Sequence, residues 1–281
     1  MTPPRSPSEV DRFESWPTSH VVEGRRHELP DPVVIEEPLA IHLDSQPLTV
    51  TMRTPGHDLE LAAGLLYGEA LIEGPADLGE LRHSTQSGVE NQVEVRLRDP
   101  APLARWRAAR AFPASSACGV CGKTTIESIF AAGLPLLEAG RPRLSAAWLE
   151  ALPERMRAAQ ALFAKTGGLH AAALFEVSNA GAELTLLRED VGRHNAVDKV
   201  IGASLLAGRL PLRDALLLLS GRAGFEIVQK AARAGVPIIA AVGAPSSLAL
   251  RTAERVGTTL IGFLRRGRFN LYTAPERIAL P

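Results

Sequence analysis

The chain contains very little cysteine and no long apolar run. Its 281 residues include two cysteines, and both lie in the run SSACGVCGK. No apolar run approaches the ~18–20 residues that a membrane-spanning helix needs, and the N-terminus has no apolar core of signal-peptide length. We therefore expect a cytoplasmic protein. In a reducing cytoplasm a single Cys-x-x-Cys is more often metal-binding or catalytic than a structural disulfide.

The chain also lacks net charge. Its 31 basic and 31 acidic residues cancel, so no whole-molecule field draws it to nucleic acid or to a membrane surface. Lysine occurs only at Lys123, Lys165, Lys199 and Lys230, and the other basic residues are arginine. Arginine suits phosphate and carboxylate, but genomic base composition explains this bias equally well. Hydrophobic residues make up 46% of the chain, which is ample for a packed core.

The first part of the chain predicts a disordered arm followed by a small α+β subdomain. Residues 1–28 are rich in proline, serine and charge, as disordered segments are. From Val33 onward, the run VVIEEPLAIHLDSQPLTVTMRT alternates short apolar and polar stretches, which favours antiparallel strands. A helix is expected in TPGHDLELAAGLLYGEALI, with Asp58 in its first turn, and a further strand in NQVEVRLRD. We expect this subdomain to span residues 29–112.

The second half of the chain predicts a layered α/β domain over residues 127–281. After a helix in LPERMRAAQALFAKTGG, the runs HAAALFEV and ELTLLRE form a hairpin. Helices then alternate with the strands DALLLLS, VPIIAAVG and TTLIGFL, and a last strand, FNLYT, follows. The continuously apolar runs DALLLLS and VPIIAAVG are typical of central strands that are covered on both faces. The expected fold class is α/β (α+β overall).

The two cysteines lie in a predicted mobile loop at residues 113–126, where flanking glycines leave little side-chain bulk.

Such a pair of cysteines can bind a metal, form a disulfide or transfer sulfur. Zinc needs about four ligands, and a site completed by His170 and His194 has no spacing to support it. A thioredoxin-like motif follows an early strand, which ASSA is not, and two ordinary buried cysteines fit poorly with a polar loop. A mobile, reactive thiolate beside Lys123 is the best interpretation.

A second candidate site is the polar run REDVGRHNAVDK at a strand-to-helix junction. Such junctions bind ligands in α/β sheets, although charge density alone favours a solvated first helical turn about equally. Two features favour function. Gly192 permits a close backbone approach, and His194 is placed to form an oriented pair with Asp198, four residues on. Arg193 and His194 are the candidate binding residues in this run.

Two small-residue loops and one basic hairpin complete the candidates. The loops SGRAGFE and GAPSS follow central strands and lead into helices, which suits phosphate, although neither is a Walker A or Rossmann fingerprint. The run FLRRGRFNLY combines guanidinium groups with aromatics that could hold an anionic, ring-bearing ligand, while a solvated basic hairpin is the plainer interpretation. The candidate binding residues of these segments are Ser220, Gly221, Arg222, Arg265, Arg266, Arg268 and Asn270.

Together these segments resemble the FdhD family, the formate dehydrogenase accessory sulfurtransferases. The matching segments are, in chain order, TPGHDLELAAGLLYGEALI, SSACGVCGK, TGGLHAAAL, REDVGRHNAVDKVIG, SGRAGFEIVQKAARAGVPIIAAVGAPSSLAL and GFLRRGRFNLYT. The resemblance implies a sulfur carrier that takes persulfide sulfur from a cysteine desulfurase. It passes this sulfur to the molybdenum or tungsten bis-guanine-dinucleotide cofactor, Mo-bis(molybdopterin guanine dinucleotide) in the molybdenum case, before the cofactor enters formate dehydrogenase. A homodimer is also implied.

The resemblance assigns roles to individual residues. It implies that Cys118 carries the persulfide, and Cys121 is the second candidate, able to relay the sulfur or to resolve the persulfide. It also implies that the cofactor contacts a continuous segment made of Phe263, Leu264, Arg265, Arg266, Gly267 and Arg268. A free guanine nucleotide is expected to mimic this cofactor. Independently of the resemblance, a carrier needs an exposed thiolate on a mobile loop, which the glycine-flanked cysteines provide.

The family's C-terminal domain is similar in fold to cytidine deaminases, but deaminase chemistry does not carry over. Zinc deaminases use His-x-Glu followed by Pro-Cys-x-x-Cys. The run GLHAAAL keeps His170 but has Ala172 in place of the glutamate, and the cysteines precede the histidine. We therefore expect neither deamination nor a structural metal. The alternative to sulfur transfer is a chaperone that binds and inserts the cofactor, with the thiols incidental or metal-binding.

Overall fold

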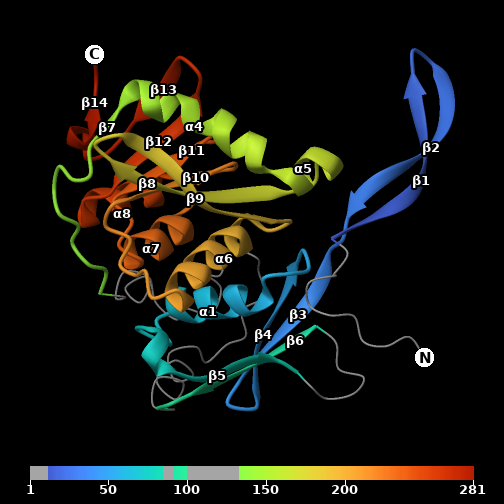
Figure 1. Cartoon of the computed structure of the whole chain (residues 1–281), viewed down its shortest axis with the longest axis horizontal. Helices are drawn as coiled ribbons and strands as arrows, with labels where there is room; N and C mark the ends of the chain where they lie inside the picture. The colour runs from blue at the N-terminus through green and yellow to red at the C-terminus, as the bar shows by residue number, and fades with distance from the viewer. Residues whose placement is uncertain (1–11, 85–90, 100–132) are drawn as a thin grey trace.

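The computed structural model describes residues 12–84, 91–99 and 133–281, which form a mixed α/β fold, α+β overall, as expected. Its centre is a six-stranded sheet in the order β13-β12-β11-β10-β8-β9 (Figure 1). Strands β10, β11 and β12 are parallel, and the other strands pair antiparallel with their neighbours. The six strands are β8 (His170–Ser178), β9 (Gly181–Asp190), β10 (Ala215–Leu219), β11 (Ile238–Ala241), β12 (Thr259–Arg265) and β13 (Arg268–Leu271).

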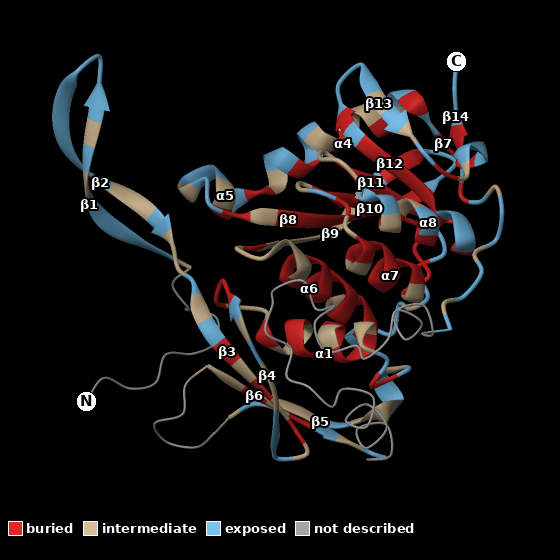
Figure 2. Cartoon of the chain, turned by 180° about the vertical axis from the view of Figure 1, so that it is seen from behind, coloured by how far each residue is buried: buried red, intermediate tan, exposed pale blue. Residues whose placement is uncertain are grey.

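Both faces of this sheet are covered. In β10, Leu217 and Leu219 belong to the core beneath α6, α7 and α8, whereas Leu216 and Leu218 belong to the core beneath α4. This alternation confirms the prediction from DALLLLS, and Figure 2 shows the central strands buried along most of their length. The covering elements are β7 (Leu144–Ser145), α4 (Ala146–Ala159), α6 (Arg193–Leu206), α7 (Phe225–Arg233), α8 (Ser247–Val256), the 3-10 helix η3 (Pro275–Arg277) and β14 (Ile278–Ala279).

A four-stranded sheet in the order β4-β3-β6-β5 lies beyond helix α1 (Figure 1). Its apolar residues Leu39 and Ile41 belong to the same buried cluster as Val197 and Ile201 of α6. One core therefore runs across the boundary that we predicted between a subdomain at 29–112 and a domain at 127–281. The elements of this part are β3 (Glu37–Leu43), β4 (Gln46–Arg53), α1 (Asp58–Gly68), the 3-10 helix η2 (Pro75–Asp77), β5 (Leu78–His83) and β6 (Gln92–Leu97).

Helices α1 and α6 cross in close contact because each has a glycine at the crossing. A Cβ atom on Gly64 would overlap with the carbonyl oxygen of Asp198, and one on Gly202 would overlap with the carbonyl oxygen of Glu60. Only glycine allows the two backbones to approach this closely. The crossing joins the four-stranded sheet to the helices that support the central sheet.

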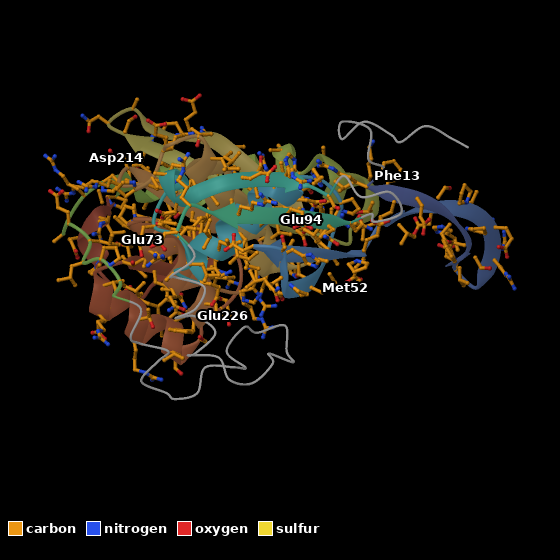
Figure 3. All side chains as sticks on the ribbon, turned by 90° about the horizontal axis from the view of Figure 1, so that it is seen from below. Phe13, Met52, Glu73, Glu94, Asp214 and Glu226 are labelled. Atoms are coloured by element: carbon orange, nitrogen blue, oxygen red, sulfur yellow. The ribbon has the colours of Figure 1, made fainter. Side chains whose placement is uncertain are left out.

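A β-hairpin arm projects from the body, with Phe13 at its base (Figure 3). Strands β1 (Phe13–Val22) and β2 (Arg25–Val34) pair antiparallel along their whole length. Residues 13–28 thus differ from the disordered arm that we predicted for 1–28, and residues 1–11 lie outside the described residues. The turn is closed by Glu23 and Gly24, both with positive φ (51° and 76°), as a two-residue hairpin turn requires.

The helix predicted in LPERMRAAQALFAKTGG is two helices joined by a sharp turn. Helix α4 begins after Ser145, whose hydroxyl accepts the Trp148 N–H at 3.4 Å, and it ends before Gln160. Gln160 has φ −80° and ψ 74°, which breaks the helix. Helix α5 (Ala161–Thr166) follows and ends at Gly167 in the left-handed conformation. The turn leaves Gln160 buried at the corner between the two helices.

No helix in the described ranges is both long and apolar enough to cross a membrane. The loop predicted at 113–126, with Cys118 and Cys121, lies outside the described residues.

Candidate functional site

The carboxyl ends of β10, β11 and β12 meet at one edge of the central sheet. Hydrogen bonds join the loops that leave these strands. The Gly243 N–H donates to the Gly221 carbonyl at 3.0 Å, and the Phe263 N–H donates to the Gly243 carbonyl at 3.0 Å. This is the edge at which open α/β sheets bind ligands. Three segments that are far apart in the sequence, around residues 221, 243 and 263, are therefore brought together as neighbours.

The loops SGRAGFE and GAPSS lie side by side at this edge. An isolated bridge pairs Ala223 with Pro245, and the Ser246 N–H donates to the Ala223 carbonyl at 3.1 Å. The Ser246 hydroxyl accepts the Ala249 N–H and so caps α8, which commits that hydroxyl to the fold. A Cβ atom on Gly243 would lie 2.9 Å from the Gly221 carbonyl oxygen, so glycine is needed for the two loops to approach.

His170 joins the same edge because β8 runs antiparallel to β10 and begins where β10 ends. The Ser220 N–H donates to the Ala171 carbonyl at 3.0 Å, and the Ser220 hydroxyl accepts the Ala171 N–H at 2.8 Å. A Cβ atom on Gly221 would lie 3.3 Å from His170 Nδ1 and 3.9 Å from Arg193 Cδ. We call the group His170, Arg193, Ser220, Gly221 and Arg222 the strand-end cluster.

The strand-end cluster is cationic. Burial lowers the pKa of His170, and the positive charges of Arg193 and Arg222 lower it further. Burial also lowers the pKa of the neighbouring His194 to about 4, with Arg193 and Lys230 adding to the effect. The Arg193 Nε atom is buried and has no hydrogen-bond partner within the described residues. Neutral imidazoles, guanidinium groups and a serine hydroxyl form a donor set that suits an anion such as phosphate.

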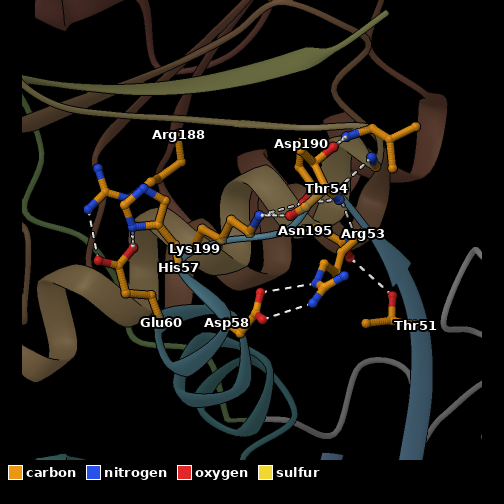
Figure 4. Close-up of polar contacts among 12 residues, drawn as sticks. Thr51, Arg53, Thr54, His57, Asp58, Glu60, Arg188, Asp190, Asn195 and Lys199 are labelled. Carbon is orange, nitrogen blue, oxygen red and sulfur yellow. Dashed lines mark hydrogen bonds and ion pairs between the residues drawn. The ribbon is translucent and has the colours of Figure 1, made fainter. Parts of the chain in front are cut away.

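Several polar residues of REDVGRHNAVDK hold elements together instead of facing this edge (Figure 4). The fully buried Asp190 lies 2.6 Å from Lys199 Nζ and accepts the Thr54 N–H at 3.2 Å. Arg188 donates to both carboxylate oxygens of Glu60, at 2.6 and 2.8 Å. These bonds fasten β9 and α6 to α1 and to the segment that precedes it. This part of the run is therefore structural, but its residues Asp190, Asp198 and Lys199 are buried and do not form the solvated first helical turn of the plainer interpretation.

The predicted pair of His194 with Asp198 is not formed. Both carboxylate oxygens of Asp198 accept hydrogen bonds from Lys230 Nζ at 2.6 Å. His194 Nε2 lies instead 3.4 Å from a carboxylate oxygen of Glu226 on α7. Asp198 is buried against the neighbouring helix, where a lysine compensates its charge, and this leaves His194 beside the strand-end cluster.

The basic hairpin β12–β13 extends past the same edge. Phe263 sits in a bulge with φ 54° and is 40% exposed, a strained conformation of the kind that collects at functional sites. The Leu264 side chain is buried in the core, so only its backbone is available to a ligand. The Gly267 N–H donates to Glu150 of α4 at 3.2 Å, and Asn270 donates to the Tyr272 hydroxyl at 3.2 Å. The remaining exposed residues of the predicted segment are Arg265, Arg266 and Arg268.

The predicted site residues thus fall into three groups. The structure brings Arg193, His194, Ser220, Gly221 and Arg222 together at the strand ends, with Phe263 beside them through Gly243. It places the tip of the basic hairpin against α4. The predicted catalytic residues, Cys118 and Cys121, lie outside the described residues.

Comparisons with known proteins identify the family. Residues 34–279 match the model of the FdhD/NarQ family. The chain belongs to this family. The sulfur carrier protein FdhD of Mycolicibacterium paratuberculosis is 44% identical over 265 residues, which cover 92% of this chain and 96% of the relative. The sulfur carrier protein FdhD of Anaeromyxobacter dehalogenans is 48% identical over 266 residues, which cover 89% of each chain.

A solved structure also matches this FdhD/NarQ-family chain. It is described as a formate dehydrogenase accessory protein from Desulfotalea psychrophila, and it superposes with a TM-score of 0.74 at 29% identity. The match covers 96% of this chain and 100% of the other. The whole arrangement of helices and sheets is therefore similar in the two proteins.

Sequence reasoning missed one group of residues in this FdhD/NarQ-family chain. At the corner between α4 and α5, the buried Gln160 and the ring of Phe163 line a hollow that also contains His170 and Ser220. The pattern of LPERMRAAQALFAKTGG does not mark Gln160 as special, because glutamine suits a continuous helix. The only sequence signal is the glycine pair before His170, which marks a loop at this point.

Proposed function

We propose that this protein is a sulfurtransferase, a sulfur carrier required for formate dehydrogenase activity. It accepts persulfide sulfur from a cysteine desulfurase and transfers it to Mo-bis(molybdopterin guanine dinucleotide) before this cofactor enters formate dehydrogenase. Relatives 44–48% identical over about nine-tenths of the chain are named sulfur carriers, which supports the proposal. Its partners are the desulfurase, the formate dehydrogenase catalytic subunit and a second copy of the chain, and it acts in the cytoplasm.

The observation that carries the proposal is the strand-end cluster in a chain of this family. The acceptor is a large anion with two nucleotide ends, so its carrier needs donors for phosphate at an accessible edge. Arg193 and Arg222 supply positive charge there, Ser220 supplies a hydroxyl, and Gly221 keeps the backbone open. Guanidinium groups and hydroxyls at the carboxyl ends of parallel strands suit phosphate groups.

The first step of the proposed chemistry is acceptance of sulfur. The Cys118 thiolate attacks the outer sulfur of the donor's persulfide. The donor's S–S bond breaks, the donor leaves as a thiolate, and a persulfide forms on Cys118. No electrons are gained or lost overall, because one S–S bond replaces another.

The second step delivers the sulfur to the acceptor as sulfide, which is two electrons more reduced than the outer sulfur of a persulfide. Cys121 supplies these electrons when its thiolate attacks the inner sulfur of the persulfide on Cys118. A Cys118–Cys121 disulfide forms, and the outer sulfur leaves as sulfide for the metal. There it replaces an oxygen ligand, which departs with two protons as water. A dithiol reductant then reduces the Cys118–Cys121 disulfide by thiol–disulfide exchange and is itself oxidised to a disulfide before the next cycle.

Complementation of a strain that lacks the protein tests this proposal. Cys118→Ala is expected to abolish activation of formate dehydrogenase, because no persulfide can form at the carrier position. The matched substitution Cys121→Ala is expected to leave persulfide formation on Cys118 intact while impairing delivery. Full activation by Cys118→Ala would contradict sulfur transfer by this residue and would favour the alternative, a chaperone that binds and inserts the cofactor without transferring sulfur.

A further inference from the structure

Most of the exposed large apolar side chains of the β-hairpin arm share one of its two faces. Side chains alternate across a strand, so the even-numbered residues of β1 share a face with their odd-numbered partners in β2. Trp16 pairs with Asp31, and Leu29 and Val33 are therefore its diagonal neighbours on the same face. Val22 lies on this face near the turn. We call Trp16, Val22, Leu29 and Val33 the arm face, and each of them is between 39% and 59% exposed.

The arm has little support of its own. A two-stranded hairpin alone is marginally stable in water, because it has no core. The body contacts the arm at its base, where Lys165 of α5 lies 5.0 Å from the centroid of the Phe13 ring, and from there the arm extends away from the body (Figures 1 and 3). The pairing of β1 with β2 nevertheless continues to the turn without a register shift. A surface that covers the arm face would stabilise this ribbon.

Prolines along the edges of the arm favour a partner on its face over an added strand. The two-residue turn makes Val22 and Arg25 a hydrogen-bonded pair, and such pairs alternate with non-hydrogen-bonded pairs along the ribbon. Pro17, Pro30 and Pro32 all stand at non-hydrogen-bonded positions, where an N–H group would point outward. Both edges therefore lack donors that an added strand would need.

The size of the arm face favours reciprocal exchange between two copies of the chain. Two paired strands of ten residues form a ribbon ~33 Å long and ~10 Å wide, so one docked arm buries about 660 Å² in total. A stable interface buries roughly 1,200–2,000 Å². One arm on an unrelated protein, or two arms packed against each other, fall below this range. Two arms exchanged across a two-fold axis bury about 1,300 Å², which reaches it.

The same chain carries an apolar surface that can receive the arm. Val50 and Met52 of β4 are 65% and 47% exposed, and they pair with Ala40 and Pro38 of β3. These four residues lie on the outer face of the four-stranded sheet, because the intervening Leu39 points into the core. We call them the β4 patch. None of them is charged, so an apolar face can cover the patch without burying an unpaired ion.

The arm of the same copy points elsewhere. Figure 3 shows the arm leaving the body at Phe13 and extending away from Met52, and Figure 1 shows the arm and β4 on different sides of the molecule. The β4 patch is therefore left to another chain.

We propose that this chain dimerises by exchange of its arms, with the arm face of each copy packed on the β4 patch of the other. The choice of partner rests on the proposed function, which includes a second copy of the chain. The arm precedes most of the region that matches the family model, residues 34–279, so family membership does not assign it this role. Trp16 is the expected centre of each contact, since buried tryptophans often dominate binding energy.

Sedimentation velocity of the full chain tests the exchange. Leu29→Arg places a charge on the arm face, and it is expected to raise the dimer dissociation constant at least about a hundredfold, because each of two contacts then buries an unpaired charge. Val50→Arg, in the β4 patch, should have an effect of similar size. Val21→Arg is the matched control, because Val21 is 68% exposed on the opposite face of the arm, and it should dimerise as the wild type does. A monomeric wild-type protein, or a dimer that neither Leu29→Arg nor Val50→Arg weakens, would overturn the proposal.

Photo-crosslinking locates the contact without adding a charge. Trp16 is replaced by the photoreactive residue p-benzoylphenylalanine, and this chain is mixed with an isotope-labelled wild-type chain. A crosslink to the peptide of the labelled chain that contains Val50 and Met52 supports the exchange. A crosslink confined to one chain, or to the arm of the labelled chain, contradicts it.

Persulfide formation on Cys118 and the melting temperature are measured on the same samples. An unchanged melting temperature shows that Leu29→Arg keeps its fold, as expected for a residue outside the core. If this variant dimerises normally while Cys118 accepts sulfur, the arm exchange is wrong and the proposed function stands. If the variant is monomeric while Cys118 of the wild type accepts no sulfur, the arm exchange stands and sulfur transfer is wrong.

Discussion

At the scale of single residues, two groups of charged side chains in the second half of the chain differ in whether a protein group of opposite charge pairs with them. Asp190 with Lys199, and Asp198 with Lys230, are buried and paired at 2.6 Å. These pairs hold helices and strands together, and their charges compensate each other. Arg193 and Arg222 instead stand at the strand ends, where an anion rather than a protein carboxylate is their expected partner.

Asp190→Asn tests the structural role of the first group. The substitution leaves the ammonium group of Lys199 buried without its counter-charge, and breaking such a pair lowers the free energy of unfolding by about 3–5 kcal/mol. Urea denaturation measures the change. Asp214→Asn, at an exposed position, is the control and should shift the free energy of unfolding by less than about 0.5 kcal/mol. A loss below about 1 kcal/mol for Asp190→Asn would contradict this role.

His194 provides a test by pH. Its pKa is lowered from 6.5 to about 4, because burial and the charges of Arg193 and Lys230 disfavour the imidazolium. NMR titration of the ring is therefore expected to show a neutral imidazole at pH 5.5, with the His194→Gln variant assigning the signal. The unfolded chain binds this proton more readily, so His194 lowers the stability of the fold as pH falls from 6.5 toward 4. A midpoint near 6.5 would show that the strand-end cluster is more hydrated than its burial indicates.

At the scale of elements, the position of the site depends on how helices approach one another. The crossing of α1 and α6 requires glycine on both sides, and the turn between α4 and α5 places Gln160 beside the strand ends. Neither the crossing nor the turn can be derived from the amphipathic pattern of the helices alone. Both decide which side chains reach the edge of the sheet.

Gly64→Ala and Gly202→Ala test the crossing. Inside a helix, alanine is intrinsically favoured over glycine by about 1 kcal/mol. Here the added methyl overlaps with a backbone carbonyl that cannot move without separating the helices, so each substitution is expected to destabilise the protein by about 3 kcal/mol. Thermal and urea denaturation measure the effect. Gly74→Ala, where nothing lies near the added atom, serves as the control, and stabilisation by Gly64→Ala would refute the close crossing.

The sequence predicts most of the central elements correctly, because apolar continuity and periodicity reflect burial directly. DALLLLS, VPIIAAVG and FNLYT are strands, and REDVGRHNAVDK leads into a helix, as predicted. The strands of the arm were harder to predict from the sequence. Pro17 and Pro30 face each other in β1 and β2, but prolines in a local sequence pattern suggest disorder. Strand pairing that tolerates prolines depends on contacts between distant residues, which a local pattern does not contain.

The sequence predicted one part of the candidate site and missed another part. Arg193, Ser220 and Arg222 follow from the rule that strand ends bind ligands, and the structure brings them together. The prediction that His194 pairs with Asp198 was wrong, because helical spacing contains no information about Lys230 of α7, which donates a hydrogen bond to Asp198. Gln160 was missed because its significance depends on a turn between two helices. The roles of Cys118 and Cys121 stay predictions, since both lie outside the described residues.

At the scale of the whole molecule, the two sheets share one core through α1 and α6. The projecting arm adds little to this core, because most of its residues are exposed (Figure 2). The strand-end cluster lies on the body, at the edge where the parallel strands end.

A shared core predicts cooperative unfolding. Differential scanning calorimetry is expected to show a single transition for the body of the protein, because separating the four-stranded sheet would expose Leu39, Ile41 and their partners in α6. Gly202→Ala should lower the temperature of this whole transition. Two resolved transitions, with only one of them shifted by the substitution, would show that the sheets belong to independent domains.

Mass spectrometry tests the central proposal, sulfur carriage by Cys118, most directly. The purified protein is incubated with a cysteine desulfurase and cysteine, and its peptides are analysed without reductant. The proposal predicts that the peptide containing Cys118 gains the mass of one sulfur atom, that Cys121→Ala retains this gain, and that Cys118→Ala loses it. A wild-type protein that gains no sulfur under conditions in which the desulfurase itself carries a persulfide would contradict the proposal.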